Sequence, residues 1–305
     1  MVPAPSLLMR LTILFLKVQG NDLNARGFPR WRREVERRAY PSPARMPRDF
    51  HTRFRVQERQ VNGQPVYVLL PSAESSQFTI IYTHGGAYVA ALISAHWDII
   101  GKLIERVGAR VIVPIYPLAP EHNYRETFPL LEEVYRSALR DRPDDRIALC
   151  GDSAGGGLAL AQAMHYRDLG LRLPDRVVLF SPWVDITMSN PGAAAVEPQD
   201  VILGSPGLVQ CGRWWAGGDD PHSPLLSPIF GDLSGLPPID IFQGTRDVLI
   251  ADARKLCEKV TAAGGAIRLF EYPGAFHVFV GATFTPEAKD AFDHVATALR
   301  LRPVA

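Results

Sequence analysis

The sequence predicts an α/β protein built on an eight-stranded, mostly parallel sheet, with helices on both faces and a helical cap. Two observations predict this class. Eight candidate strands, six of them apolar runs, lie between residue 53 and residue 270, and amphipathic helical patterns separate most of the later ones. Near-continuous apolar strands that alternate with helices are typical of a parallel sheet covered on both faces. The length of 305 residues, 47% hydrophobic and 21% charged, suits one large domain or two small ones.

The eight expected strands are two segments that flank a turn and six apolar runs that follow them. In chain order they are 53–60, 64–70, 78–82, 111–115, 147–150, 177–180, 239–242 and 267–270. Asn62 and Gly63 separate the first two segments. This dipeptide is a strong hairpin signal because both residues tolerate a positive φ. We therefore expect the first two strands to form a hairpin.

Four helices are expected from apolar residues that recur on one face of a helix. Gly108 is expected to end the first of them, and Gly264 with Gly265 the third. In chain order, the four apolar faces are Trp97, Ile100, Ile104 and Val107; Leu130, Leu131, Val134, Tyr135 and Ala138; Leu249, Ala253, Leu256 and Val260; and Ala288, Phe292, Val295 and Leu299.

Two regions do not follow the alternation of strands and helices. Residues 1–50 have a helical pattern and precede the sheet, and residues 184–238 form a long insertion rich in Gly, Pro and Ser. A long excursion within a compact domain is usually functional. We expect an N-terminal helical cap segment over 1–50 and a main domain over 51–305, with the insertion 184–238 contributing to the cap.

The charge is distributed unevenly. The formal net charge of +1 gives no indication of a nucleic-acid partner, yet residues 1–60 carry thirteen Lys or Arg against five Asp or Glu. Such a basic segment is either a solvated helical face or a contact site for an anionic membrane or another protein. The three cysteines, Cys150, Cys211 and Cys257, are too few and too widely spaced for a disulfide framework or a metal site. This fits a reducing compartment and a cytoplasmic location.

The apolar stretch 7–20 is not expected to span a membrane. Arg10 and Lys17 interrupt it, it is too short to cross a bilayer, and no small-residue cleavage site follows it. We expect an amphipathic helix packed on the protein, with peripheral membrane contact as the alternative. The residues that share its apolar arc are Leu7, Leu11, Leu14, Phe15 and Val18.

The segment Gly151-Asp152-Ser153-Ala154-Gly155 matches the pattern G-x-S-x-G. It stands between an expected strand and a small-residue helix, the context in which this pattern exposes a nucleophilic serine on a sharp turn. Glycines on either side of Ser153 let the strand and the helix approach closely. A phosphate-binding glycine loop is the alternative, but G-x-G-x-x-G is not matched from Gly151 because position 153 is serine.

A nucleophilic serine needs a base, and the base needs an acid that orients it. His277 stands just beyond the eighth expected strand and Asp247 just beyond the seventh. The chain order Ser153, Asp247, His277 is the triad order of α/β hydrolases. All three residues follow the carboxyl ends of strands, where open α/β sheets bind ligands. The competing side chains lie further along helices, on the insertion or in structural positions, and are Asp185, Asp252, His84, His96 and His294.

Acyl transfer also needs donors for the negatively charged oxygen of its tetrahedral intermediate. The loop 83–89, Thr-His-Gly-Gly-Ala-Tyr-Val, follows the third expected strand and can supply backbone N–H groups. The N–H of Ala154, directly after the serine, supplies another donor. This chemistry requires neither a metal ion nor an organic cofactor, and none is expected.

These residues resemble the hormone-sensitive-lipase-like carboxylesterases of the α/β-hydrolase fold. The resemblance covers roughly residues 65–300 and rests on HGGAY (84–88), YPLAPEH (116–122), GDSAGG (151–156), and SPLLSP with LPP within 223–238, together with the Asp and His already named. It implies that Ser153 is the nucleophile, His277 the general base and then acid, and Asp247 the orienting acid.

The same resemblance implies an oxyanion hole built from the N–H groups of Gly85, Gly86, Ala87 and Ala154. The resemblance also implies that Glu121 helps to hold the site in place without contacting the substrate. We expect His84 and Asp152 to support the site in the same way. The chain departs from the family at Ala87, where a third glycine is usual, and at Pro117, where Arg is usual. An alanine keeps its N–H, which remains a donor to the oxyanion if its φ is negative.

The substrate pocket is the least defined part of the expected site. The candidate lining residues are Tyr88, Trp214, Trp215 and Phe276. For the adjacent tryptophans, an equally good interpretation is that they lock the insertion onto the core. The departures from the family affect the expected substrate preference more than the chemistry.

The leading hypothesis is a serine carboxylesterase that hydrolyses short-to-medium acyl esters through an acyl-enzyme intermediate. The first alternative is an acyltransferase, amidase or deacetylase that uses the same triad. The second is a non-catalytic ligand receptor, since plant gibberellin receptors resemble this family but lack the functional histidine, which is present here. The expected partner is a small-molecule acyl ester, and an edge strand at the last position would also permit a homodimer.

Overall fold

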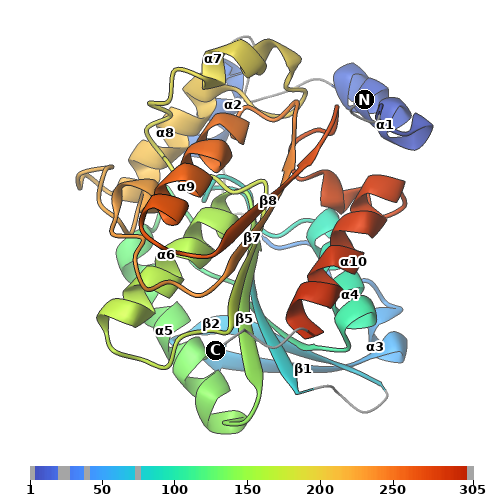
Figure 1. The fold of residues 1–305 in the computed structure, drawn as a ribbon, viewed down its shortest axis with the longest axis vertical. Helices are drawn as coiled ribbons and strands as arrows, with labels where there is room; N and C mark the ends of the chain where they lie inside the picture. Colours follow the sequence, from blue (N-terminus) through green and yellow to red (C-terminus); the bar gives the residue numbers. More distant parts are fainter. Residues whose placement is uncertain (1–3, 20–27, 38–41, 73–76, 301–305) are drawn as a thin grey trace.

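The computed structural model describes residues 4–19, 28–37, 42–72 and 77–300. A single eight-stranded sheet runs through the centre of the molecule, in the spatial order β1-β2-β4-β3-β5-β6-β7-β8 (Figure 1). The eight expected strands are confirmed, with ends that differ by a few residues at most. They are β1 (Phe54–Val61), β2 (Gln64–Pro71), β3 (Phe78–Thr83), β4 (Arg110–Pro114), β5 (Arg146–Asp152), β6 (Arg176–Phe180), β7 (Ile239–Gly244) and β8 (Ile267–Tyr272).

The sheet is parallel except at β2, which pairs antiparallel with both β1 and β4. Asn62 and Gly63 turn the chain between β1 and β2 with φ values of 50° and 79°, which confirms the expected hairpin. Strands β4, β6 and β7 are buried along their whole length. This burial explains their uninterrupted apolar sequences, because helices cover both faces of the sheet.

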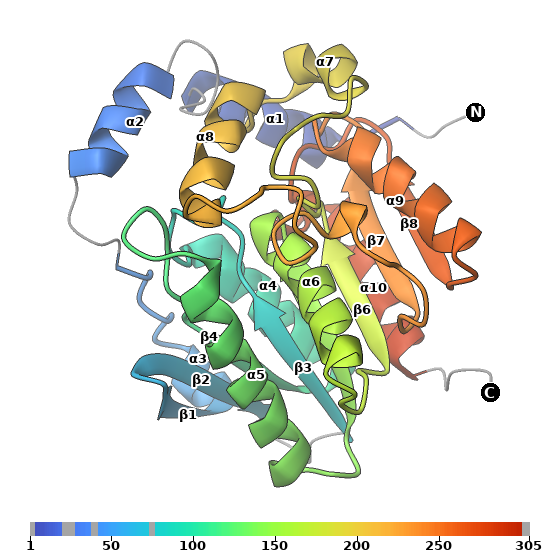
Figure 2. The same ribbon diagram turned by 90° about the vertical axis from the view of Figure 1, so that its left-hand side faces the viewer.

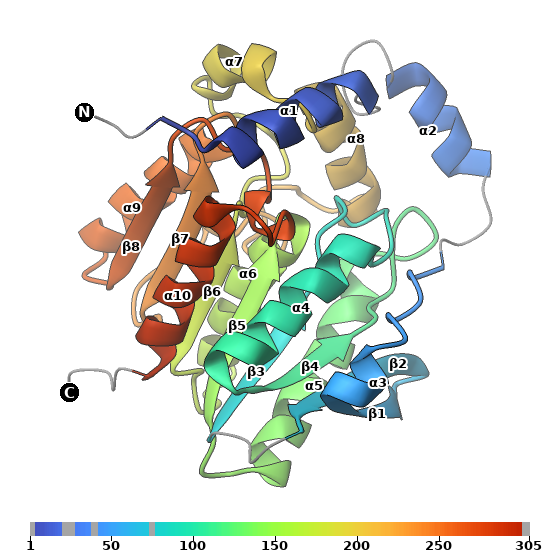
Figure 3. The ribbon, with the colours of Figure 1, turned by 90° about the vertical axis from the view of Figure 1, so that its right-hand side faces the viewer.

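Helices cover the two faces in separate groups (Figures 2 and 3). α5 (Tyr124–Asp141), α6 (Ala154–Asp168) and α9 (Ile250–Ala262) lie on one face, and α3 (Phe50–Arg53), α4 (Ser94–Val107) and α10 (Pro286–Arg300) on the other. α4, α5, α9 and α10 confirm the four helices expected from apolar periodicity. Each group packs its apolar residues on the sheet, so the core consists of two clusters separated by the strands.

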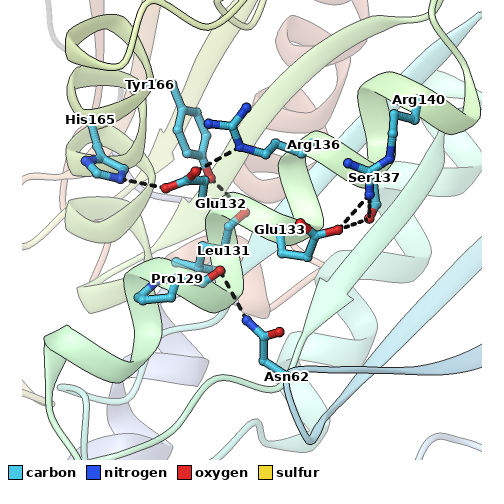
Figure 4. A network of polar contacts seen from close by, with 10 residues as sticks. All are labelled: Asn62, Pro129, Leu131, Glu132, Glu133, Arg136, Ser137, Arg140, His165 and Tyr166. Atoms are coloured by element: carbon cyan, nitrogen blue, oxygen red, sulfur yellow. Dashed lines mark hydrogen bonds and ion pairs between the residues drawn. The ribbon is translucent and has the colours of Figure 1, made fainter.

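Hydrogen bonds tie α5 to α6 and to the β1–β2 hairpin (Figure 4). The Tyr166 hydroxyl donates to the Leu131 carbonyl oxygen at 2.9 Å. The Asn62 amide nitrogen donates to the carbonyl oxygen of Pro129, within α5, at 3.3 Å. Together these bonds fix α6, the helix that follows Ser153, relative to the antiparallel edge of the sheet.

Four further helices lie together beyond the carboxyl ends of the parallel strands (Figures 1 and 3). They are α1 (Leu7–Gln19), α2 (Phe28–Arg37), α7 (Ala193–Val196) and α8 (Ser205–Ala216). The two regions that interrupt the alternation of strands and helices are therefore neighbours in space. Within the described part of the chain, no helix combines the length and the apolar character needed to cross a membrane.

The helix expected near the N-terminus is present as α1, but it packs through a different face. Met9 and Ile13 are buried against the apolar cluster beneath α4 and α10. The Ser6 N–H and hydroxyl both donate to the Glu287 carboxylate, at 2.6 and 2.8 Å, and fix the start of α1 against α10. The arc that was expected to pack on the protein is instead exposed to solvent, and consists of Leu7, Leu11, Leu14, Phe15 and Val18. The prediction was wrong because periodicity identifies an apolar arc but not which arc meets a neighbouring element.

The buried Asp240 carboxylate in β7 joins three strands, and its removal should destabilise the fold. It accepts hydrogen bonds from Arg176 of β6 at 2.8 Å and from Arg268 of β8 at 2.7 Å. Asp240→Ala leaves the buried Arg176 charge without its partner, so we expect the free energy of unfolding in urea to fall by about 3–5 kcal/mol. The control Asp293→Ala removes an exposed ion pair with Arg106 and should cost less than about 1 kcal/mol. Equal losses in the two variants would contradict this expectation.

Candidate active site

Ser153 occupies the turn between β5 and α6 in a strained backbone conformation. Its φ of 52° and ψ of −122° are rare for a residue with a side chain. Among its backbone hydrogen bonds, two tie it to β6 and to the segment after β6: its N–H donates to the Phe180 carbonyl oxygen, and its carbonyl oxygen accepts from the Trp183 N–H, both at 2.9 Å. The strand, the sharp turn and the helix are those expected around G-x-S-x-G.

The glycines of the motif are required by the close approach of chain segments. A Cβ atom at Gly155 would lie 2.0 Å from the Thr83 carbonyl oxygen, and one at Gly151 would lie 2.2 Å from the Gly155 carbonyl oxygen. Real Cβ atoms essentially never come within 3.0 Å of another heavy atom. The first turn of α6 can therefore pack against β3 and β5 only when these positions lack side chains.

His277 and Asp247 form a buried, hydrogen-bonded pair. His277 Nδ1 lies 2.8 Å from Asp247 Oδ2, while Asp247 Oδ1 accepts the N–H of Leu249 at 2.9 Å. Burial alone would lower the pKa of His277, but the charge and hydrogen bond of Asp247 outweigh it, and the net effect raises this pKa. The structure thus brings together the histidine and the aspartate that the chain order indicated.

The loop after β3 carries the residues expected to form the oxyanion hole, and the structure corrects one of them. The N–H of Gly85 donates to Asp152 Oδ1 at 3.0 Å, so Gly85 supports the loop rather than facing a substrate. Gly86 and Ala87 line the same cavity as Ser153 and His277. Ala87 has a φ of 52° and Tyr88 a φ of 63°. The φ of Ala87 is therefore not the negative value that the sequence analysis required for its N–H to donate to the oxyanion. Two consecutive left-handed residues with side chains make this loop a second strained segment of the site.

Asp152 connects the loop 83–89, which we call the oxyanion loop, to the turn at Ser153. Besides the Gly85 N–H, its carboxylate accepts a hydrogen bond from the Tyr82 hydroxyl and lies 3.3 Å from His96 Nε2. Burial would raise the pKa of Asp152, but His96 and the hydrogen bonds from His96 and Tyr82 outweigh it and hold this pKa below its ordinary value. A charged Asp152 therefore holds the loop in place.

His84 and the YPLAPEH segment support the loop from its other side. Burial lowers the pKa of His84 to about 3, so the ring is neutral, and it stacks on Tyr116 at 4.4 Å. The Tyr116 hydroxyl donates to the His84 carbonyl oxygen at 2.6 Å, and the Ala119 N–H donates to the Tyr88 carbonyl oxygen at 2.8 Å. Glu121, which the family resemblance implied in this role, has an exposed side chain and does not line the cavity. Backbone and tyrosine contacts of the same segment provide the support instead.

A cavity of about 750 Å³ opens at Ser153 and His277. Its walls are almost entirely apolar and come from α1, the oxyanion loop, the start of α4, the insertion and the segment after His277. Phe276 lines the cavity, but Tyr88, Trp214 and Trp215 do not. Tyr88 and Trp215 are buried and stack on each other with ring centroids 4.2 Å apart. For Trp215 the structure therefore favours the alternative in which it locks the insertion onto the core.

Asp200 was not expected at the site, yet it lies beside the histidine–aspartate pair. Its carboxylate accepts the N–H groups of Ile202 and Leu203 on the insertion and of Val248 next to Asp247, each at 2.8 Å. Burial and the nearby charge of Asp247 raise the pKa of Asp200 to about 6. Asp200 thus joins the insertion to the loop that carries Asp247. An aspartate that bonds to amides just after it is common in turns, so the sequence alone does not mark it as a site residue.

A strained serine between a strand and a helix, followed in the chain by a hydrogen-bonded Asp–His pair at the carboxyl ends of parallel strands, defines the class of α/β hydrolases. Residues 80–281 match the family described as alpha/beta hydrolase fold, and the chain belongs to this family.

Individual proteins narrow this class further. An acetyl-hydrolase of Streptomyces hygroscopicus is 35% identical over 202 residues, which cover 66% of this chain and 68% of the relative. A carboxylesterase of Mycobacterium tuberculosis is 31% identical over 268 residues, which cover 81% and 82%. The crystal structure of an esterase from the bacterial hormone-sensitive lipase family superposes with a TM-score of 0.82 at 27% identity, and covers 98% of this chain and 99% of that chain. The resemblance to the hormone-sensitive-lipase-like carboxylesterases and the prediction of a carboxylic ester hydrolase are confirmed.

The contribution of Asp200 to the pKa of His277 predicts a shifted pH profile. The negative charge of Asp200 helps to raise the pKa of His277, so Asp200→Asn should lower it. We expect His277 to act as the general base, a role that requires the neutral ring, so the acid limb of the kcat/KM profile should move to lower pH in this variant. The matched control is Asp252→Asn, which removes another buried carboxyl with a pKa raised to about 6 and should leave the limb in place. An unchanged limb in Asp200→Asn, or an equal shift in both variants, would contradict the prediction.

Proposed function

We propose that this protein is a serine carboxylesterase in which Ser153, His277 and Asp247 form the catalytic triad. The observation that carries the proposal is the buried hydrogen bond between His277 Nδ1 and Asp247 Oδ2, together with the position of Ser153 and His277 on one cavity. The Asp247 carboxylate accepts a hydrogen bond from the Nδ1–H group and thereby selects the tautomer whose Nε2 can accept a proton.

In the first half of the reaction, the Ser153 Oγ attacks the ester carbonyl carbon as His277 Nε2 takes the hydroxyl proton. The tetrahedral intermediate then collapses: the bond to the alcohol oxygen breaks, the alcohol leaves with the proton from His277, and the acyl group remains on Ser153. In the second half, His277 removes a proton from water, which attacks the acyl-enzyme. Collapse of the second intermediate releases the carboxylic acid and returns the proton to Ser153 Oγ.

We assign the oxyanion that forms in each half to the N–H groups of Gly86, Ala87 and Ala154. The left-handed φ of Ala87 does not meet the condition set from the sequence, but it strains the backbone without removing the N–H, so Ala87 is kept as a donor. Gly86 and Ala87 belong to the loop on the cavity wall, and Ala154 begins α6 directly after the nucleophile. In another serine hydrolase, removal of one such donor costs about 3–4 kcal/mol of transition-state stabilisation. The N-terminus of α6 adds a favourable partial positive charge. Gly85 is left out of the hole because Asp152 takes its N–H.

The substrate assigned to this site is an ester with a short-to-medium apolar acyl group. The cavity volume of about 750 Å³ exceeds what an acetyl group fills, and its walls offer few polar partners. We assign residues 51–305 to the catalytic domain, and residues 1–50 with 184–238 to a cap that supplies part of the apolar wall. α1 contributes Leu8 and Leu11 to that wall, and the insertion contributes Ile202 and Leu203.

Replacement of the nucleophile tests the proposal. Ser153→Ala should lower kcat for p-nitrophenyl butyrate by at least about a thousandfold and abolish labelling by a fluorophosphonate probe. Ser137→Ala, on α5 and outside the cavity, should leave both unchanged. Hydrolysis at equal rates by wild type and Ser153→Ala on acetate, butyrate and decanoate esters would contradict the proposed triad.

A bulky residue in the cavity should select against long acyl groups. Ile202 lines the cavity from the insertion, so Ile202→Trp fills space there. We expect kcat/KM for p-nitrophenyl decanoate to fall about tenfold or more, because each excluded methylene forfeits a favourable apolar contact, while the acetate ester loses less than about threefold. An equal loss on both esters would contradict the assignment of this wall to the acyl group.

A further inference from the structure

α1 presents a group of large apolar side chains to solvent. Their exposed fractions range from 43% to 80%, and they are Leu7, Leu8, Leu11, Leu14, Phe15 and Val18. Single exposed apolar residues are ordinary on soluble proteins, but a contiguous group on one element indicates an interaction surface. The helix is firmly attached through its opposite side, because Met9 and Ile13 are buried and Ser6 bonds to Glu287.

This apolar surface is continuous with the cavity at Ser153. Leu8, Leu11 and Phe15 line the cavity, and so do two further apolar residues that are more than half exposed, Ile93 and Phe284. The remaining exposed apolar residues of α1 do not line it. They are Leu7, Leu14 and Val18. Because they are seven and four residues apart, they lie on one side of the helix, which we call the outer face of α1.

Two cationic side chains border the outer face of α1 along one side. Arg10 and Lys17 are exposed and seven residues apart, so they lie on the same side of the helix, beside Leu14. The sequence of α1, LLMRLTILFLKVQ, contains no acidic residue. An apolar helical face bordered by Lys and Arg is the arrangement that inserts into the headgroup region of an anionic bilayer. An uncharged apolar partner would gain nothing from these cations, so the charge selects an anionic lipid surface as the occupant.

We propose that the outer face of α1 docks on an anionic lipid surface and holds the mouth of the cavity against it. Leu7, Leu14 and Val18 enter the acyl boundary, while Arg10 and Lys17 contact lipid phosphates. The docking itself needs no catalysis. Only its consequence, the entry of ester substrates into the cavity from the lipid surface, rests on the proposed function.

Vesicle co-sedimentation tests the docking with the full chain carrying Ser153→Ala, so that no lipid is hydrolysed. We expect binding to vesicles of phosphatidylglycerol and phosphatidylcholine in equal amounts, and binding at least about tenfold weaker to phosphatidylcholine alone. Adding Leu14→Asp with Val18→Asp should weaken binding to the mixed vesicles by about tenfold or more. Adding Arg10→Gln with Lys17→Gln should weaken it by about fivefold per residue at low salt.

The matched control is Leu169→Asp, which places a charge on an exposed leucine after α6, remote from α1 in sequence, and should leave vesicle binding unchanged. With Ser153 restored, the Leu14→Asp, Val18→Asp variant should hydrolyse soluble p-nitrophenyl acetate within about twofold of wild type, because neither residue lines the cavity. Loss of vesicle binding with retained hydrolysis of this ester separates a role in docking from general damage to the fold.

Three outcomes overturn the proposal. The first is equal binding, or no binding, to both kinds of vesicle, and the second is vesicle binding that survives Leu14→Asp with Val18→Asp. The third is a wild-type dimer, seen in light scattering, that this double variant converts to monomers. The last outcome assigns the outer face of α1 to a second copy of the chain. Failure of the proposed function has a different signature, because wild type would then bind mixed vesicles without hydrolysing p-nitrophenyl acetate.

Discussion

The close packing of α6 against β3 and β5 is the constraint on which the rest of the site depends. Because Gly151 and Gly155 have no side chains, the chain passes from β5 into α6 through a single residue, Ser153. That residue takes a left-handed φ, a conformation that costs about 1–3 kcal/mol and persists only where surrounding contacts enforce it. The enforcing contacts are backbone hydrogen bonds with the last residue of β6 and with the segment after it, so the sheet itself sets the position of Ser153.

The same turn positions the oxyanion loop through one buried carboxylate. Asp152 is the last residue of β5 and directly precedes Ser153, and it holds the Gly85 N–H, the Tyr82 hydroxyl and His96. A buried charge is tolerated only when its hydrogen bonds are made, so a displacement of the loop would leave this carboxylate unsatisfied. Ser153 and the loop therefore behave as one unit, although about sixty-five residues separate them in the chain.

Polar chemistry and apolar walls come from different parts of the molecule. The serine, the aspartate, the histidine and the oxyanion loop all follow strands of the central sheet, whereas much of the apolar wall comes from α1 and the insertion beyond the strand ends. Asp200 links the two parts, because it bonds to amides of the insertion and to the amide next to Asp247. Rigid strands thus position the polar groups of the candidate site, and segments outside the sheet supply much of its apolar wall.

By itself, the sequence determined the eight strands, the helices on both faces, the turn at Ser153 and the order of the three triad candidates. These features are local or topological: apolar periodicity, glycine spacing and the positions of strand ends are all readable along the chain. Only the tertiary structure decided that the Gly85 N–H donates to Asp152 and that Trp215 stacks on Tyr88 away from the cavity. It likewise decided that Glu121 faces solvent and that Asp200 lies at the site. It also decided that α1 packs through Met9 and Ile13 and leaves its larger apolar arc exposed. Each of these outcomes depends on which distant segments meet, and contacts between segments far apart in the chain leave no periodic signal in it.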